Sequence, residues 1–220
     1  MLLLWMGCFS IAPDAFEAWK ARLDSGLSDS HLGACESADI LFLETFDDGD
    51  YTSNPPGVAI NPDDARGYAA VVQNELRILR DVSGGNGGSI SVVYDTLIPV
   101  TSETIVKFDV KPTYSDVING CGNSCGEYPI NVRLTLLLDN SETIFLQYSY
   151  GYQGSVDKED DLLIRKAFGD VEQDAWLFNE HFRIYDSIEA NQIVEVIIFG
   201  SGWDFEGYVD NLVICQPDLP

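Results

Sequence analysis

The chain has 220 residues, of which 45% are hydrophobic and 11% aromatic, so it is too apolar to be disordered and long enough for one all-β domain or two small ones. Its 36 acidic residues outnumber 12 basic ones, and the formal net charge of −24 argues against binding nucleic acid or an anionic membrane. An acidic chain suits divalent cations, although solubility alone also explains such an excess.

The first twelve residues, "MLLLWMGCFSIA", are apolar but too few to span a bilayer, which takes about 20. They resemble the apolar part of a secretory signal without its basic start. "WMGC" loosely resembles a lipoprotein attachment site in which Cys8 would carry the lipid. The alternatives for these twelve residues are a miscalled or truncated start of the sequence, or an ordinary apolar strand or helix. An N-terminal anchor is the only membrane attachment that we expect.

The segment 12–27 carries the one clear helix signal, because Pro and Asp open it, Gly26 ends it and apolar residues recur at helical spacing. A polar stretch up to residue 36 then has the composition of a linker. We expect 1–36 to be a leader or linker with a short helix, either cleaved, lipid-anchored or left from a preceding segment. We expect 37–220 to be the main domain.

From residue 39 onward, short β segments separated by turn signals such as "NPPG" and "SGGNGG" replace the helical pattern. About ten or eleven such strands with regular turns predict an all-β fold, an antiparallel β-sandwich of the jelly-roll type. The expected strands are 39–46, 67–72, 75–81, 89–94, 103–110, 129–138, 142–150, 162–168, 175–184, 192–199 and 206–215.

Five cysteines allow a disulfide framework. Cys35 precedes the first strand segment and Cys215 ends the last one, so this pair would join the domain ends if those strands are neighbours. Cys121 and Cys125 lie in the Gly-rich "GCGNSCGEY" and would close a small ring. The pairing stays open, since four cysteines allow three connectivities and Cys8 is left over. Two disulfides would imply an oxidising compartment, and the spacings do not support the alternative of a zinc site.

The last strand segment contains "YVDNLVI", which suits a half-buried strand except for its central Asp and Asn. Because strand side chains alternate, we expect Tyr208, Asp210, Leu212 and Ile214 on one face. A lone buried carboxylate is costly unless it is paired or bound to a metal. Asp210 is therefore a candidate metal ligand. The alternatives are exposure on a sheet edge, or hydrogen bonds to backbone amides or an arginine.

The first strand segment runs into "LETFDDGD", which pairs with this last motif as in a known group of proteins. A first strand ending F-[DE]-[DE]-G and a last strand with [YF]-[VI]-D-[ND]-[LIV] resemble the jelly-roll carbohydrate-binding modules and related galactose-binding-like and lectin-like domains. The resemblance implies adjacent terminal strands and a structural Ca²⁺ held by Asp47 and Asp210. Asp48 and Asp50 either add ligands or only solvate the turn.

Aromatic residues near the ends of strands are the candidates for carbohydrate binding. Tyr148, Tyr150 and Tyr152 alternate in "QYSYGYQG", and Trp203 lies in the Gly-rich "SGWDFEG" beside two acidic residues. Ligand sites combine such rings with a few polar groups, and loops concentrate binding residues. Packing of the tyrosines between strands, and of Trp203 as a cap on the sandwich, are the alternatives.

A catalytic site is less well supported by the sequence. No carboxylate pair has the spacing of the laminarinase-like sandwich enzymes, and no nucleophile, phosphate-loop or metal-hydrolase motif occurs. His181 has Arg183 two residues on, which a polysaccharide lyase could use, although such a pair is typical of a strand surface. The sequence leaves enzyme activity open and favours a protein without it.

The resemblance predicts a secreted, calcium-stabilised, non-catalytic carbohydrate-binding module of the lectin-like type. Its partner would be a polysaccharide or other glycan, and its place extracellular, on the cell surface or periplasmic. Two alternatives remain: a structural or adhesive surface module that binds protein, and a divergent glycan-active enzyme.

Overall fold

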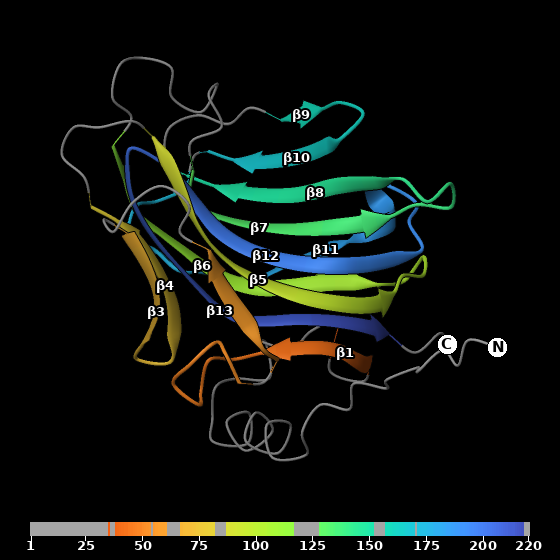
Figure 1. The fold of residues 1–220 in the computed structure, drawn as a ribbon, viewed down its shortest axis with the longest axis horizontal. Helices are drawn as coiled ribbons and strands as arrows, with labels where there is room; N and C mark the ends of the chain where they lie inside the picture. Colours follow the sequence, from red (N-terminus) through yellow and green to blue (C-terminus); the bar gives the residue numbers. More distant parts are fainter. Residues whose placement is uncertain are drawn as a thin grey trace.

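The computed structural model describes residues 35, 38–53, 55–60, 67–81, 87–116, 128–151, 157–169 and 171–217, which form two facing β-sheets without an α-helix (Figure 1). This confirms the predicted all-β sandwich. The expected helix in 12–27 lies outside the described residues, as do Cys8, Cys121, Cys125 and Tyr152. Among the described residues no helix is long and apolar enough to cross a membrane.

One sheet has six strands and the other seven. The six-stranded sheet has the order β11 (Leu177–Arg183), β6 (Ile105–Asp116), β13 (Asp204–Pro217), β4 (Glu75–Arg80) and β3 (Gly67–Val72), with β1 (Ala38–Glu44) also paired to β13. The seven-stranded sheet has the order β2 (Gly57–Ile60), β5 (Gly88–Pro99), β12 (Gln192–Gly202), β7 (Tyr128–Leu137), β8 (Thr143–Tyr150), β10 (Leu163–Phe168) and β9 (Lys158–Glu159). Neighbouring strands run antiparallel except for β8 and β10, which are parallel.

The core between the sheets follows from period-two alternation. In β4, "ELRILR", every second residue is buried, and Leu76 and Ile78 are fully buried. The inward residues of both sheets form one large apolar cluster, which includes the aromatic pairs Phe108 with Tyr150 and Phe42 with Tyr94. Burial of these apolar faces supplies the main driving force for the fold.

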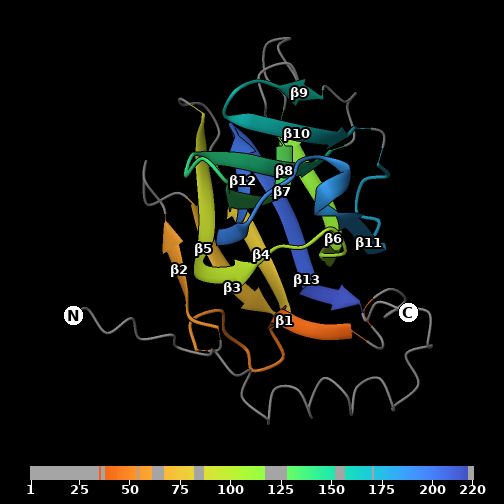
Figure 2. The same ribbon diagram turned by 90° about the vertical axis from the view of Figure 1, so that its right-hand side faces the viewer.

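The first and last strands are neighbours, as the resemblance implied: β1 pairs antiparallel with β13, and both views show the two strands together (Figures 1 and 2). Cys35 and Cys215 form a disulfide with a Cα–Cα distance of 5.8 Å. A smaller apolar cluster that includes Leu43 and Val213 surrounds this disulfide. The chain ends of the sandwich are therefore held both by pairing and covalently.

Candidate functional site

The outer face of the seven-stranded sheet, opposite the core, carries polar and aromatic side chains in register. The strands β12, β7, β8 and β10 lie side by side there (Figure 1). Their cross-strand partners form two adjacent rows: Ile197, Arg133, Gln147 and Arg165 in one, and Phe199, Asn131, Ser149 and Ala167 in the next. Alternation sends these residues away from the core that their neighbours form.

Four of these residues form a continuous hydrogen-bond network, which we call the polar floor: Asn131, Arg133, Gln147 and Ser149. The amide nitrogen of Gln147 donates to Asn131 Oδ1 at 3.0 Å and to Ser149 Oγ at 2.7 Å. Arg133 donates to Gln147 Oε1 from Nε at 3.0 Å and from Nη2 at 2.6 Å. Asn131 Nδ2 donates to the carbonyl oxygen of Phe199 at 3.1 Å. Each side chain is thus held in one orientation by its neighbour.

The polar floor is deeply set although it lies on the outside of the sheet. Asn131 and Ser149 are 0% exposed, whereas Arg133 is half-buried. The guanidinium of Arg133 lies over the rings of Phe199 and Phe145, 4.5 and 5.1 Å from their centroids. Burial lowers the pKa of Arg133. The face therefore combines aromatic rings, Phe145 half-buried and Phe199 buried, with fixed polar groups, as ligand sites do.

Two further contacts continue this face on either side of the polar floor. Arg165 lies 5.4 Å from the ring centroid of Tyr128, which a bulge in β7 brings onto the same face. At the other end, Thr135 donates to Glu195 Oε2 at 2.8 Å. The sequence analysis did not single out these residues, although the alternation of polar residues in "NVRLT" and "FLQYS" was a usable signal.

The tyrosines proposed for carbohydrate binding point to the other side of the same strand. Tyr148 and Tyr150 are 0% exposed and belong to the core. Tyr148 stacks on Phe182 with ring centroids 4.2 Å apart, and Tyr150 stacks on Phe168 at 4.8 Å. The structure thus shows the packing alternative for these two rings.

Trp203 lies where the chain passes from one sheet to the other. It separates β12 from β13, directly after Gly202, whose φ of 142° is a conformation that favours glycine. The residue is half-buried, and its carbonyl oxygen accepts a hydrogen bond from Arg80 Nη1. Trp203 is therefore part of a sandwich corner rather than of the polar floor.

The expectation that Tyr208, Asp210, Leu212 and Ile214 share one face is wrong. A bulge interrupts the register of β13 against β6 between Asp210 and Val213, and Asn211 has a left-handed φ of 49°. The extra residue resets the alternation. Leu212 and Ile214 consequently point into the core, while Asp210 points outward.

Asp210 lies beside a second buried carboxylate on the outer side of the six-stranded sheet. Its cross-strand partner on β6 is Asp109, and the two are 7% and 5% exposed. Asn211 joins them: its Nδ2 donates to Asp109 Oδ2 at 2.8 Å and to Asp210 Oδ2 at 3.1 Å. The backbone amides of Asn179 and Asn211 donate to the remaining oxygens of Asp109 and Asp210 at 2.7 and 2.8 Å. Asp109 was not predicted from the sequence as a ligand.

Asp210 lies at a gap in strand pairing, close to the end of β1 and the turn that follows it. Along one edge, β13 pairs with β4 up to Val209 and with β1 from Leu212, so Asp210 falls between the two partners. Asp47 on the turn accepts a hydrogen bond at 3.3 Å from Nδ2 of Asn74, which lies in the turn before β4. Asp47 thus contacts the turn that precedes β4, and its role as a ligand together with Asp210 stays a prediction.

Asp48 and Asp50, the other predicted ligands, stabilise the turn itself. Asp48 accepts the amide of Asp50 and the hydroxyl of Ser53, at 3.1 and 2.8 Å. Asp50 accepts the amides of Thr52 and Ser53, at 2.6 and 3.0 Å. No cluster of three or more acidic, histidine or cysteine side chains suited to a metal ion is found within the described part of the chain.

Glu44 at the end of β1 is buried, in contrast to the exposed turn that follows. Its Oε1 accepts the amide of Phe46 at 2.9 Å, and its Oε2 lacks a hydrogen-bond partner of ordinary geometry. Burial raises the pKa of this carboxyl to about 8, although the bond from Phe46 opposes the shift. The negative charges of Asp48 and Asp50 add to the increase. Glu44 is thus protonated at neutral pH.

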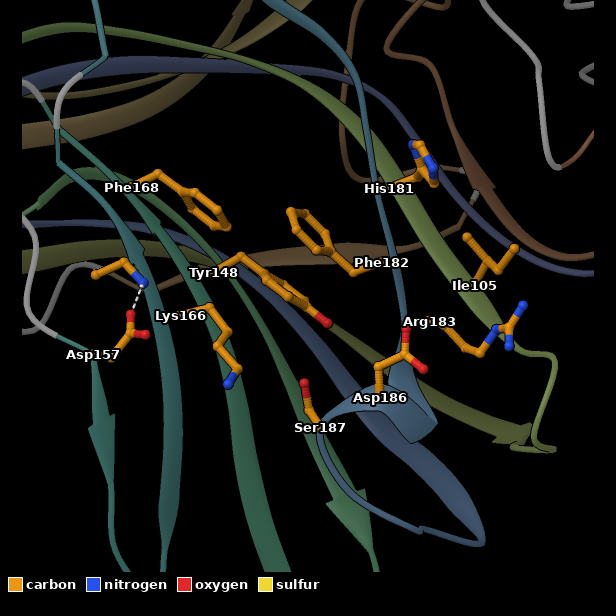
Figure 3. A pocket seen from close by; sticks show the side chains of 11 residues that line it. Ile105, Tyr148, Asp157, Lys166, Phe168, His181, Phe182, Arg183, Asp186 and Ser187 are labelled. Carbon is orange, nitrogen blue, oxygen red and sulfur yellow. Dashed lines mark hydrogen bonds between the residues drawn. The ribbon is translucent and has the colours of Figure 1, made fainter.

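A cavity of about 640 Å³ opens at the edge of the sandwich between β10 and β11 (Figure 3). Tyr148 points its buried hydroxyl into it, with Lys166 and Asp186 on the same side. His181 and Arg183 also line the cavity, but His181 points away from Tyr148 and Arg183 is 3.5 Å from a carboxylate of Glu103. His181 and Arg183 are thus an exposed strand pair.

Comparison with known proteins gives likenesses of fold only. No family model and no curated protein matches the chain. Similar solved structures include the module TmCBM61 in complex with β-1,4-galactotriose, with 10% identity and a TM-score of 0.41 over 79% of this chain and 94% of that one. "CBM4 structure and function" describes another, with 15% identity and a TM-score of 0.39 over 80% and 97%.

A third similar structure is part of a larger protein. It comprises the CBM22-1 and GH10 modules of xylanase 10B from Clostridium thermocellum with xylohexaose, and has 9% identity and a TM-score of 0.46. The match covers 83% of this chain but 29% of that one. These neighbours are of the class that the sequence resembles, and at such identities they do not place the chain in a family.

Proposed function

We propose that the chain is a glycan-binding module whose ligand lies across the outer face of the seven-stranded sheet. The observation that carries this proposal is the polar floor, in which Asn131, Arg133, Gln147 and Ser149 form one hydrogen-bonded network beside the rings of Phe145 and Phe199. Sugars offer hydroxyls to fixed polar groups and apolar ring faces to aromatic side chains. Both kinds of surface meet here on rigid strands.

Aromatic truncation on this face tests the proposal. Purified protein is run through native gels that contain one polysaccharide each, from a panel of neutral and acidic plant and algal polymers. We expect at least one polymer to retard the wild type and Phe145→Ala to lose about 10-fold in affinity, the usual value of one stacked ring. Tyr68→Ala is the matched control, since Tyr68 is 46% exposed on the other sheet. Equal loss in both variants, or no retention by any polymer, would contradict the proposal.

We further propose that the module is secreted and binds without catalysis. The disulfide between Cys35 and Cys215 supports an oxidising compartment, where such bonds persist. Incubation of each retained polymer with the protein is expected to release no new reducing ends or unsaturated products. Product formation that disappears in His181→Ala or Glu195→Gln would instead support a glycan-active enzyme.

We also propose that a Ca²⁺ ion stabilises the gap beside β13. Asp109 and Asp210 fit such an ion, because two nearly buried carboxylates lie side by side and hard oxygen ligands are what calcium prefers. Asp47 on the adjacent turn is the third candidate ligand. A bound ion would join the turn after β1 to the last strand.

Thermal melts in calcium and in excess chelator test this part separately. A ligand bound only by the folded state raises the Tm, so calcium is expected to raise the Tm of the wild type and to leave that of Asp210→Asn unchanged. Asp48→Asn is the control, since Asp48 is exposed and caps its own turn. Coincident wild-type melts would refute the calcium site and leave the glycan proposal untouched.

A further inference from the structure

Arg133 is an unusual cation for so acidic a chain. It is half-buried at the centre of the polar floor, and among the described residues no carboxylate forms an ion pair with it. Half-buried cations on the other sheet do have such partners: Arg77 lies 2.8 Å from Glu206, and Lys111 lies 3.7 Å from Glu75. A positive charge removed from water without a counter-charge is costly. The protein therefore maintains a site where an anion from outside would be stabilised.

The contacts of Arg133 leave one edge of the guanidinium available. Nε and one hydrogen of Nη2 donate to Gln147 Oε1, while the rings of Phe145 and Phe199 pack against it. The two hydrogens of Nη1 and the second hydrogen of Nη2 take no part in these bonds. Together they form the planar two-donor fork that binds a carboxylate through two parallel hydrogen bonds.

We propose, resting on the glycan-binding function of this face, that Arg133 binds a carboxylate of the glycan and that the ligand is a polysaccharide containing uronic acid. Gln147 fixes the orientation of the fork, and Phe145 and Phe199 prevent the guanidinium from rotating. Arg165 lies across Gln147 in the same row. Glu195 lies one row away beside Thr135 and is suited to accept sugar hydroxyls rather than the acid group.

The net charge of −24 does not oppose this binding at close range. Surface charges more than about 8 Å away are screened at physiological ionic strength, whereas contacts on a partly buried face are screened much less. The acid group therefore responds to Arg133 at close range rather than to the total charge. Repulsion by the whole molecule is expected to slow association at low salt.

The test compares each acidic polymer with its own carboxyl-reduced form. Polygalacturonate, alginate and glucuronan are reduced to their neutral counterparts, which keep the linkages and carry a hydroxymethyl group in place of each carboxylate. Dextran sulfate and dextran provide a sulfated pair. Dissociation constants are measured for the wild type, Arg133→Gln and Arg133→Lys. Arg77→Gln is the matched control, because Arg77 also lies over two aromatic rings but on the other sheet.

We expect the wild type to bind at least one uronate polymer about 10-fold or more tightly than its reduced form, as charge-assisted hydrogen bonds allow. Arg133→Gln removes this preference, Arg133→Lys retains part of it, and Arg77→Gln leaves it unchanged. The wild-type comparison is decisive even if the Arg133 variants fold poorly.

A wild type that prefers the reduced forms, or dextran sulfate over all uronates, would overturn the inference. An equal loss of acidic and neutral binding in Arg133→Gln would do so as well. If neutral polymers are retained through Phe145 while no uronate is preferred, only the uronate inference fails. If no polymer of either kind is retained, the glycan-binding function fails with it.

Discussion

The outer faces of the two sheets each place an arginine over two aromatic rings, with opposite outcomes. On the six-stranded sheet, Arg77 lies 5.8 and 6.0 Å from the ring centroids of Tyr68 and Tyr208 and donates to Glu206 at 2.8 Å. On the seven-stranded sheet, Arg133 lies closer to its two rings but donates to a neutral amide. The same side-chain type therefore has a carboxylate partner on one face and a neutral amide partner on the other.

The pKa shifts follow this difference. Burial is the largest single influence on the pKa of Arg77 and lowers it, but the hydrogen bond to Glu206 and the negative charge of Glu206 together raise the pKa above its ordinary value. The pKa of Arg133 is lowered by burial. Tyr208 also donates to Glu206, at 2.6 Å, so the acid of the six-stranded sheet is used within the protein. On the six-stranded sheet Arg77 therefore has an internal carboxylate partner, whereas Arg133 on the seven-stranded sheet donates to the amide of Gln147.

The largest effect on stability is expected from loss of the disulfide, which ties the chain before β1 to β13 in the six-stranded sheet. Replacing both Cys35 and Cys215 with Ser should lower the free energy of unfolding by about 2–5 kcal/mol, since a native disulfide restricts the unfolded chain. The measurement is urea unfolding at fixed pH. Glycan affinity of the remaining folded protein should not change, because the disulfide lies on the other sheet. A parallel loss of affinity would show that the two faces are not independent.

Glu44 is buried at the end of β1 and should make the free energy of unfolding depend on pH. Its carboxyl has a pKa of about 8 when folded against an ordinary value of 4.5, so between these values the folded protein holds a proton that the unfolded chain releases. The protonated carboxyl therefore makes its full contribution to the free energy of unfolding below about pH 4.5, and this contribution is lost progressively as the pH rises to about 8. Above that, Glu44→Gln should be more stable than the wild type by up to about 5 kcal/mol, the full value of the shift.

The Glu44 comparison is made by urea unfolding between about pH 4 and 9 with chelator present. Glu172→Gln is the control because Glu172 is exposed. Since the whole acidic chain loses stability through repulsion at high pH, the informative quantity is the difference between the variants. Parallel curves for the wild type and Glu44→Gln would contradict the buried, protonated carboxyl.

Gln147→Glu should convert Arg133 into a copy of the paired Arg77. The new carboxylate would lie where Gln147 Oε1 now accepts two hydrogen bonds from Arg133, and it would lose the bonds that the Gln147 amide donates to Asn131 and Ser149, so circular dichroism must first show that the fold is retained. Affinity for uronate polymers should fall about 10- to 100-fold, because the ligand must compete with an internal acid. Titration of the variant with the polymer that retains the wild type checks this. Unchanged affinity would mean that the charge of Arg133 is not used.

The reverse change, Glu206→Gln, should free Arg77 without creating a glycan site. Because this ion pair is part-buried rather than fully enclosed, the loss of stability should be about 1 kcal/mol. No uronate binding is expected, since Arg77 has no equivalent of the polar floor. New uronate binding in native gels would indicate that an arginine without a carboxylate partner is sufficient for uronate binding, without a polar floor.

Most of the strands could be predicted from sequence because their alternation is strong. The segment 75–81 matches β4, for example, and 142–150 matches β8. The strands β2 and β9 were missed because they are short edge strands: "GVAI" shows no polar alternation, and Lys158–Glu159 lies within a run of charges. Pattern reasoning has little to detect in such elements.

The candidate site was harder to predict because it depends on which side of each strand faces inward. In "FLQYSY" the tyrosines and the polar residues occupy opposite faces, and either set could have formed the exposed one. The cross-strand register that joins Gln147 to Arg133 cannot be read from either strand alone. For Asp210, the neighbour Asn211 was the missed signal, since asparagine readily adopts the left-handed conformation that a bulge requires.

The central claim is that a glycan lies on the seven-stranded face, and amide chemical-shift mapping with the best-retained polymer fragment tests it most directly. The account predicts that the shifts concentrate in the central parts of β7, β8 and β12, around Arg133, Gln147 and Phe199. Shifts confined to the six-stranded sheet, or to the edge cavity around Tyr148 and Lys166, would contradict it.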